Sequence, residues 1–247
     1  MKGVPIDINC DVGEGMGNEA MLFPYITSCN IACGGHAGDK NAMKHMVQLA
    51  KRYNVKIGAH PSYPDRENFG REALTISTEA LQRSIKEQLG EFNAILREER
   101  VQLHHIKAHG ALYNKMVKDR ALSSLFLEAI KMYQNQVFLY VPYASEISIE
   151  AKERGFKIKN EVFGDRNYNV DLSLVSRTME NALIKDPKKV LAHVLHIIKT
   201  NTVKTIADKK IRTLADTVCI HGDTSTALEI LMYLSKELPN HQVQPKK

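Results

Sequence analysis

Several features that would place this chain in a familiar class of protein are missing from its sequence. The four cysteines form no C-x-x-C pair, so neither a zinc knuckle nor a thioredoxin-type redox motif is indicated. No apolar run is long enough to span a bilayer, and the opening segment MKGVPIDINCD lacks the apolar region of a signal peptide. We therefore expect a cytoplasmic protein without membrane contact, in which the cysteines are small buried residues. They are Cys10, Cys29, Cys33 and Cys219.

The common nucleotide-binding motifs are also absent. The sequence contains no G-x-x-x-x-G-K-[ST] loop. The glycine-rich segment GEGMG is followed by Asn18 where G-x-G-x-x-G needs glycine, and Glu14 would face an incoming phosphate. We expect this segment to be a mobile lid or a tight turn, and any nucleotide to be held by other means or by another chain.

The formal net charge of +6 raises the question of an anionic partner. The lysines are scattered, and pairs such as Lys188 and Lys189 fall where solvated helix ends or loops are expected. No alternation of aromatic and basic residues suggests base stacking. We expect no binding to nucleic acid, whereas a mildly basic pocket for a small carboxylate remains compatible with the charge.

The order of elements predicts an α/β fold in one domain over residues 1–247. The chain is 247 residues long with 43% hydrophobic and 25% charged residues, which suits one large barrel. Helical patterns fill most gaps between the strands, as at residues 43–50, where Asp39 is placed to cap the helix. The strand-like segments are residues 4–12, 28–34, 55–60, 103–109, 137–142, 157–163 and 216–221, with another at 172–177. We expect disorder only at the terminal segment QVQPKK.

Such alternation predicts parallel strands, either in a seven- or eight-stranded β/α barrel or in an open doubly wound sheet. An open sheet gathers ligands at one switch point, whereas a barrel draws residues from most strand ends. Polar residues follow almost every strand-like segment here, so we favour the barrel.

Four short runs end on a histidine beside small residues: IACGGH, IGAH, IKAH and VCIH. The histidines are His36, His60, His109 and His221. A polar residue at the C-terminal end of a parallel strand is how an α/β barrel assembles its active site. One such histidine is commonly a structural residue, but four in one register point to a functional site.

The first strand carries a polar row. Period-two geometry places Asp7, Asn9 and Asp11 on one face and apolar residues on the other, so the polar row points into the barrel. Burying two carboxylates is costly unless they are paired, hydrogen-bonded or bound to a metal. A structural network with a nearby Lys or Arg would satisfy them, but a functional role is the preferred interpretation.

The fourth strand repeats this parity, with His105, Lys107 and His109 on one face. A lysine inside a barrel needs a carboxylate partner, which Asp7, Asp11 or Glu161 can supply. Such a lysine can hold a substrate carboxylate or polarise a carbonyl, and an adjacent histidine can move protons.

The long loop in GAHPSYPDRENFGR, residues 58–71, is ordered by two prolines and carries two arginines. Arg66 or Arg71 is placed to grip a carboxylate or phosphate, and a surface position is the alternative.

A metal site is a further interpretation of the strand ends. Asp11, His60 and His109 come from separate strands and suit a hydrolytic metal ion. No H-E-x-x-H or other compact metal spacing supports it, so a divalent ion remains open at this point.

Six segments resemble, in order and spacing, the LamB/YcsF family: DINCDVGEG, TSCNIACGGHAGD, IGAHPSYPDRENFGR, KAHGALYN, EVFGDR and VCIHGDT. The resemblance implies a β/α barrel of the glycoside hydrolase/deacetylase type. It further implies the 5-oxoprolinase reaction, in which 5-oxo-L-proline is cleaved to L-glutamate with ATP, accompanied by Mg²⁺, as co-substrate. The implied partners are 5-oxoprolinase subunits B and C. The sequence departs from the family pattern at Ser176, in a loop that carries Arg177, and at Gly164.

The residues implied for chemistry are Asp11, His60, Lys107, His109 and Glu161. Those implied for substrate binding are Asp7, Asn9, His36, Asp165, Arg166 and His221. Asn30, at the second strand, and Arg66 and Arg71, in the long loop, are further candidates for substrate binding from their place in the sequence. Our mechanistic hypothesis is that the amide oxygen is phosphorylated and water then opens the ring. Asp11 or Glu161 would act as the base, His109 or His60 as the proton donor to nitrogen, and Lys107 as the stabiliser of the oxyanion or phosphate.

Two alternatives remain. One is an ATP-independent, metal-dependent amidohydrolase or deacetylase that acts on another lactam or amide. The other is a non-catalytic subunit that binds 5-oxoproline and presents it to its partners.

Overall fold

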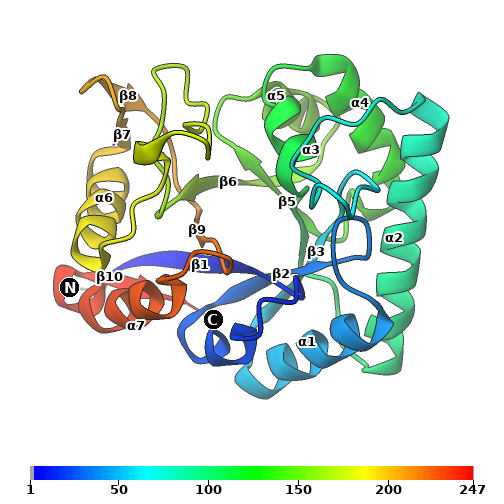
Figure 1. The fold of residues 1–247 in the computed structure, drawn as a ribbon, viewed down its shortest axis with the longest axis horizontal. Helices are drawn as coiled ribbons and strands as arrows, with labels where there is room; N and C mark the ends of the chain where they lie inside the picture. The colour runs from blue at the N-terminus through cyan, green and yellow to red at the C-terminus, as the bar shows by residue number, and fades with distance from the viewer. Residues whose placement is uncertain (1–2, 247) are drawn as a thin grey trace.

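A closed barrel of seven parallel strands forms the centre of the molecule (Figure 1). The computed structural model describes residues 3–246. The barrel closes because β1 pairs with β2 on one side and with β9 on the other. Its strands, in spatial order, are β1 (Val4–Val12), β2 (Ser28–Ala32), β3 (Lys56–His60), β4 (His105–Ile106), β5 (Phe138–Pro142), β6 (Lys157–Phe163) and β9 (Thr217–Ile220). The predicted β/α barrel is confirmed, in its seven-stranded form.

Helices surround this barrel on the outside (Figure 1). They are α1 (Lys40–Tyr53), α2 (Thr78–Glu98), α3 (Gly110–Lys115), α4 (Arg120–Ala129), α5 (Glu146–Glu153), α6 (Pro187–Thr200) and α7 (Ala227–Glu237). Short 3₁₀ turns are η1 (Glu19–Met21), η2 (Phe23–Tyr25), η3 (Lys131–Tyr133), η4 (Glu180–Ala182) and η5 (Pro239–His241). The predicted cap of α1 is present, because the Asp39 carboxylate accepts a hydrogen bond from the Ala42 amide at 2.8 Å.

The two faces of β1 follow the predicted alternation. Ile6, Ile8, Cys10 and Val12 are buried in the apolar layer between the strands and the helices. The polar face points into the barrel, where the Asn9 amide donates to Glu161 of β6 at 2.9 Å. All four cysteines are free and buried, as expected.

Strand β4 is shorter than the predicted segment 103–109, but the backbone keeps its parallel pairing beyond it. The Lys107 amide donates to the Ala59 carbonyl at 3.0 Å, and the His109 amide donates to the Pro61 carbonyl at 2.9 Å. The inward parity of residues 105, 107 and 109 is therefore preserved without a longer strand.

Two predictions about strands and disorder are wrong. Residues 172–177 form a loop with one isolated bridge, between Tyr168 and Leu174, because this segment packs over the barrel mouth rather than in the sheet. The terminal segment was expected to be disordered, but its residues Val243–Pro245 form strand β10. This strand pairs in parallel with Val4–Ile6 of β1, just before the part of β1 that pairs with β9. Lys247 of that segment lies outside the described residues. Sequence reasoning also missed the hairpin of β7 (Thr202–Lys204) and β8 (Lys210–Arg212).

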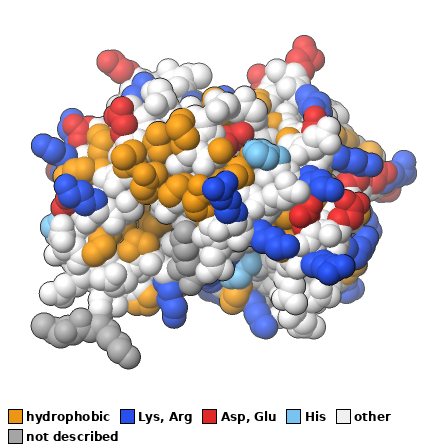
Figure 2. Space-filling model, turned by 90° about the horizontal axis from the view of Figure 1, so that it is seen from below, with side chains coloured by type: hydrophobic (Ala, Val, Ile, Leu, Met, Phe, Trp, Pro, Cys, Tyr) orange, Lys and Arg blue, Asp and Glu red, His pale blue; other side chains and the backbone are white. Residues whose placement is uncertain are grey.

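The outer surface is uneven. On the face drawn in Figure 2, hydrophobic side chains gather on the side of α7 and η1, whereas lysines and arginines lie mostly on the opposite side. Met21 and Met232 are among the exposed hydrophobic residues. Within residues 3–246, no helix has both the length and the hydropathy needed to cross a bilayer.

Gly58 of β3 leaves room for a buried imidazole inside the barrel. A Cβ at this position would overlap the His105 ring, whereas a Cβ at Gly90, exposed on α2, meets nothing within 4 Å. We expect Gly58→Ala to lower the free energy of unfolding by about 1–3 kcal/mol through overpacking. The matched control Gly90→Ala should raise it by about 0.5–1 kcal/mol, because alanine favours the helix. Urea unfolding of both variants measures this, and equal effects would contradict the packing argument.

Candidate active site

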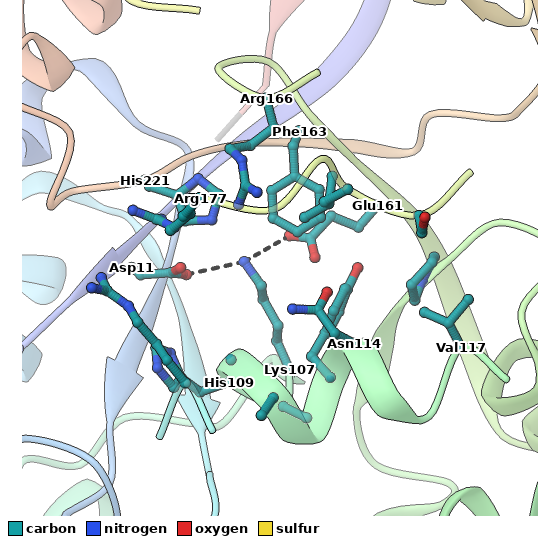
Figure 3. Close-up of a pocket in the computed structure, with 18 of the residues that line it drawn as sticks. Asp11, Lys107, His109, Asn114, Val117, Glu161, Phe163, Arg166, Arg177 and His221 are labelled. Atoms are coloured by element: carbon teal, nitrogen blue, oxygen red, sulfur yellow. Dashed lines mark hydrogen bonds and ion pairs between the residues drawn. The ribbon is translucent and has the colours of Figure 1, made fainter. Parts of the chain in front are cut away.

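A cavity of about 500 Å³ opens at the C-terminal ends of the barrel strands. Its walls come from β1, β3, β5 and β6, from the start of α3, and from the loops that follow β3, β6 and β9. Figure 3 shows Lys107 reaching into the middle of this space, with Asp11 on one side and Glu161 on the other. The polar strand ends of the sequence therefore meet in one chamber.

Lys107 is the centre of the site. Its ammonium lies 3.0 Å from Asp11 Oδ1, 3.0 Å from Glu161 Oε1 and 3.1 Å from the sulfur of Cys219. Burial acts to lower the pKa of Lys107, but Asp11 foremost, with Cys219 and Glu161, holds it well above its usual value. Lys107 therefore stays charged at neutral pH.

The two carboxylates beside Lys107 titrate in opposite directions. Burial acts to raise the pKa of Asp11, but Lys107 and then His60 hold it well below its ordinary value. For Glu161 burial dominates and raises the pKa, with Lys107 opposing it. Asp11 is thus a fixed anion, whereas Glu161 is the group that is easier to protonate.

Below these groups lies a layer of amides that positions them. The Asn30 amide donates to Asn9 Oδ1 and to Asp11 Oδ1, each at 2.7 Å, and His105 Nε2 lies 2.7 Å from Asn30 Oδ1. Asn9 and Asn30 were predicted to bind substrate, but the structure places both outside the cavity lining. From there they act on the site through Asp11 and Glu161.

Asp7 lies deeper still, at the opposite end of the polar row. Its carboxylate accepts hydrogen bonds from the hydroxyls of Thr217, Ser28, Thr27 and Tyr140 at 2.7 to 3.1 Å. Burial acts against ionisation, yet these hydroxyls, led by Thr217, lower the pKa of Asp7. The predicted substrate-binding role does not match this place, since the cavity lining does not include Asp7.

Three of the four singled-out histidines form a cluster on one side of Asp11. The rings of His36 and His109 stack with centroids 3.6 Å apart, and His60 Nε2 lies 3.0 Å from His109 Nδ1. His60 and His109 line the cavity, and His36 lies behind them. Burial lowers the pKa of His36 to about 3 and holds the pKa values of His60 and His109 well below normal. All three rings are neutral at pH 7.

Glu14 joins this cluster from the turn after β1. Its Oε1 lies 3.0 Å from His36 Nε2 and 3.5 Å from His109 Nδ1. Burial, followed by the negative charges of Asp11 and Asp223, raises the pKa of Glu14 well above its usual value. Sequence reasoning placed Glu14 only in a glycine-rich turn. The positive φ angles of Gly13 and Gly15 on either side of it allow the chain to bend sharply there.

The fourth histidine stands apart, on β9's side of the cavity. His221 Nδ1 lies 2.9 Å from Asp165 Oδ1, its ring stacks on Phe163 with centroids 5.0 Å apart, and the Thr224 hydroxyl donates to the same carboxylate at 3.0 Å. Burial opposes ionisation of Asp165, but His221 lowers its pKa. Asp165 lies outside the cavity lining and orients His221, which lies within it.

The predicted arginines divide by position. Arg66 donates to the Gly38 carbonyl and does not line the cavity. Arg71 lines the cavity and forms an ion pair with Asp223. Asp223 also pairs with Arg177, whose Nη1 lies 3.0 Å from Asp223 Oδ2. Arg166 lines the cavity too. Arg177 and Asp223 were not among the predicted site residues. Arg177 was missed because nothing in the sequence indicates that the 164–186 segment folds over the barrel mouth.

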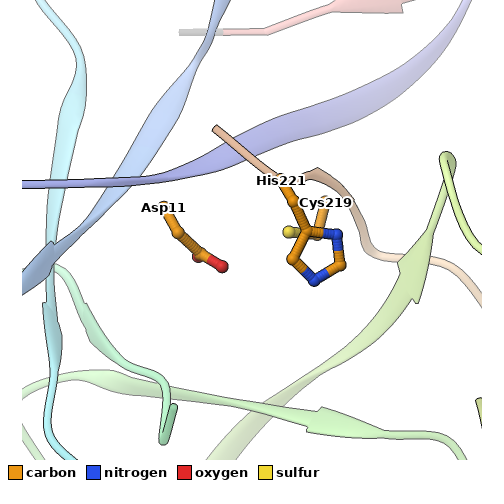
Figure 4. A group of neighbouring side chains, drawn as sticks. All are labelled: Asp11, Cys219 and His221. Carbon is orange, nitrogen blue, oxygen red and sulfur yellow. The ribbon is translucent and has the colours of Figure 1, made fainter. Parts of the chain in front are cut away.

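Ligand atoms for a metal ion gather around the same centre. Glu14 belongs to two such groups, one with Asp11 and His60 and one with His36 and His109, in each of which the ligand atoms lie within 4.8 Å of one another. Asp11, Cys219 and His221 make a third (Figure 4). The predicted metal ligands are therefore neighbours but do not form one group. Asp11 and His60 belong to the first group, and His109 belongs to the second.

Comparisons with known proteins agree with this geometry. The LamB/YcsF family model matches residues 6–247. A relative from Pyrococcus abyssi, named as the A subunit of 5-oxoprolinase, is 39% identical over 244 residues, covering 97% of this chain and 96% of the relative. The crystal structure of a lactam utilization protein from Thermus thermophilus superposes with a TM-score of 0.89 at 31% identity, covering 98% of this chain and 99% of the other.

A more distant likeness concerns the fold alone. A family 4 carbohydrate esterase from Streptomyces lividans, in complex with acetate, has a TM-score of 0.50 at 8% identity, with coverage of 99% of this chain and 92% of the other. It agrees with the barrel fold.

The buried histidines predict that acid destabilises the fold. Six histidines have pKa values lowered by burial: His36, His60, His104, His105, His109 and His193. Between about pH 6.5 and 4 the unfolded chain binds protons that these residues cannot bind when folded, so stability falls as pH falls. The raised pKa values of Glu14 and Glu161 act in the opposite sense, but two groups oppose six. We expect a loss of at least about 2 kcal/mol between pH 7.5 and 5.

Urea unfolding at several pH values measures this slope. The pKa of His193 is lowered by burial to about 4, outside the cavity, so His193→Gln should make the slope shallower. The control His45→Gln, on the exposed side of α1, should leave it unchanged. Stability that is flat or rises toward pH 5 would show that the histidines are not held neutral.

Proposed function

The chain belongs to the LamB/YcsF family, and from that premise we propose that it is the A subunit of a 5-oxoprolinase, which opens the ring of 5-oxo-L-proline to give L-glutamate. The reaction is coupled to ATP hydrolysis, with Mg²⁺ accompanying ATP, and subunits B and C are the partners. The observation that supports this most directly is Lys107 held between Asp11 and Glu161 in the cavity at the barrel mouth. A fixed cation in such a place can stabilise the negative charge that develops on an amide oxygen.

The need for ATP follows from the chemistry of the substrate. A five-membered lactam is an unstrained amide, and its nitrogen is a poor leaving group. Phosphorylation of the amide oxygen makes the ring carbon electrophilic, water then adds to that carbon, and the carbon–nitrogen bond breaks as nitrogen takes a proton. The sequence has no P-loop, so ATP is held by other means or by a partner subunit.

Proton movement can be assigned from the charge states of the site. Glu161 or Asp11 is the base for water, and the low pKa of Asp11 makes Glu161 the stronger of the two. His60 and His109 are neutral, so neither carries a spare proton of its own. Burial raises the pKa of Glu14 well above its usual value, which makes it the acid of this cluster, and it lies 3.5 Å from His109 Nδ1. Glu14 itself lines the cavity, so we assign it as the proton donor to the leaving nitrogen, whereas Nε2 of His109 is taken up by the Phe69 carbonyl at 2.9 Å.

The second candidate function is a metal-dependent amidohydrolase or deacetylase that needs no ATP. It is favoured by the ligand groups around Glu14. A divalent ion at Asp11 and His60 would lie close to the Lys107 ammonium, 3.0 Å from the same Asp11 oxygen, and the two cations would repel each other. The group of Glu14, His36 and His109 suits an ion better, and there the ion would polarise a carbonyl oxygen. A non-catalytic subunit that only binds the lactam is the third interpretation of the same cavity.

The proton assignment predicts the effect of Glu14→Gln. Glutamine keeps the shape of the side chain but supplies no proton, so we expect kcat to fall at least about a hundredfold with KM little changed. Steady-state rates of glutamate release measure this. The control Glu67→Gln, exposed in the loop before α2, should behave like the unchanged protein. Normal turnover by folded Glu14→Gln would exclude Glu14 as the acid.

The proposed reaction is tested by assaying glutamate release from 5-oxo-L-proline by the purified chain. The assay is run alone and with subunits B and C, with and without ATP, and before and after chelation of tightly bound metal. We expect glutamate only when partners and ATP are both present. Release without ATP that is abolished by chelation would favour the metal-dependent amidohydrolase.

A variant pair ties that activity to the cavity. Lys107→Met removes the central cation and should lower turnover by more than about a hundredfold. Lys159→Met is the control, since Lys159 lies on β6 against the rings of Phe138 and Tyr140, outside the cavity. Equal turnover in both folded variants would exclude Lys107 from the chemistry and favour the non-catalytic subunit.

A further inference from the structure

Arg166 is a buried cation without a carboxylate partner. Its side chain is almost fully buried, yet among the ion pairs of residues 3–246 none involves Arg166 within 4.0 Å. Its guanidinium donates to two backbone carbonyls, those of Val175 at 2.6 Å and Ala182 at 3.4 Å. A guanidinium has five N–H donors, so some remain for another acceptor. A buried charge in this state is costly unless an anion joins it.

The guanidinium of Arg166 faces the cavity beside that of Arg177 (Figure 3). The two cations are close enough that repulsion by Arg177, after burial, lowers the pKa of Arg166. A protein gains nothing in stability from placing two like charges together in a partly buried cavity wall. Such pairs are typical of places where an oxyanion binds, because a planar guanidinium matches two oxygens of a carboxylate or phosphate.

The local charges support an anion rather than a structural ion pair. Arg71, Arg166 and Arg177 all line this end of the cavity, and Asp223 accepts from two of them, Arg71 and Arg177. One carboxylate thus serves two arginines, and Arg166 has none of its own. Asp165 is nearby but is held by His221 and Thr224. An incoming anion would complete the pairing.

We propose that Arg166 and Arg177 form an anion site that binds an oxyanion of the substrate, either the carboxylate of a lactam acid or a phosphoryl group. The proposal rests on the proposed function for the identity of that substrate, but the site itself needs no turnover. The anion lies against Arg166, and Arg177 exchanges part of its contact with Asp223 for the ligand. The cavity then selects a charged lactam over a neutral one.

The test is calorimetric titration of the whole chain with three probes: 5-oxo-L-proline, the neutral lactam 2-pyrrolidinone, and inorganic phosphate. We expect Arg166→Met and Arg177→Met each to lower the affinity for at least one of the two anions by about tenfold or more, and to leave the affinity for 2-pyrrolidinone unchanged. Loss confined to 5-oxo-L-proline identifies the carboxylate as the ligand, and loss confined to phosphate identifies the phosphoryl group. Arg166→Lys keeps the charge and should lose less.

Arg83→Met, on the exposed surface of α2, is the matched control. Arg166→Met also removes two contacts to the loop backbone, whereas Arg177 donates to a side chain, so Arg177→Met keeps the test valid if the first variant unfolds. Unchanged affinity for both anions in folded variants, an equal loss for the neutral lactam, or no anion binding by the unchanged chain would overturn the proposal. Anion binding that depends on these arginines, in a chain that releases no glutamate under any condition, would uphold the site and refute the reaction.

Discussion

The charged ammonium of Lys107 inside the barrel is the constraint on which the rest of the site depends. A buried cation must be matched by nearby anions, and Asp11 and Glu161, each 3.0 Å away, supply them. Two carboxylates and one ammonium leave one negative charge in excess, which is why burial can raise the pKa of Glu161 while Asp11 stays ionised. Asn9 and Asn30 then become necessary, because they donate the hydrogen bonds that hold these carboxylates in place.

The same excess of negative charge governs the histidine side of the cavity. Asp11 is one cause of the raised pKa of Glu14, after burial, and burial keeps the stacked rings of His36 and His109 neutral. A carboxyl whose pKa is raised can hold a proton beside neutral imidazoles without adding net charge to a buried place. The ion pairs of Lys107 and the raised pKa of Glu14 are therefore linked, since both depend on the negative charge of Asp11.

The sequence predicts those parts of the fold and the site that depend on residues close together in the chain, and it fails where distant segments meet. Strand parity is local, so the inward rows of β1 and β4 and the β/α barrel could be predicted from the sequence. Asp7 shows the limit, because parity gives the face of a strand but not the depth along it, and four hydroxyls hold Asp7 below the cavity. Arg177 and Asp223 meet across 46 positions of the chain through an irregular loop, for which no periodicity gives a signal. Glu14 was hidden by its glycine-rich turn, whose positive φ angles decide where the side chain points.

The cavity is positively charged at Arg166 and Arg177 and carries neutral rings at His60 and His109, and that difference affects how a substrate is oriented. Arg166 and Arg177, from the loop before α6, lie on one side of Asp11, and His109 lies on the other, with Lys107 reaching toward Asp11 (Figure 3). A lactam that carries a carboxylate also has a charged end and a neutral end, namely its carboxylate and its amide. An anion held at the arginines therefore directs the amide toward Lys107 and the proton of Glu14, whereas the reversed orientation places a carboxylate against Asp11 and Glu161. Repulsion by these carboxylates disfavours the second pose, although Lys107 would offset part of it, so the anion site biases the orientation of the ring.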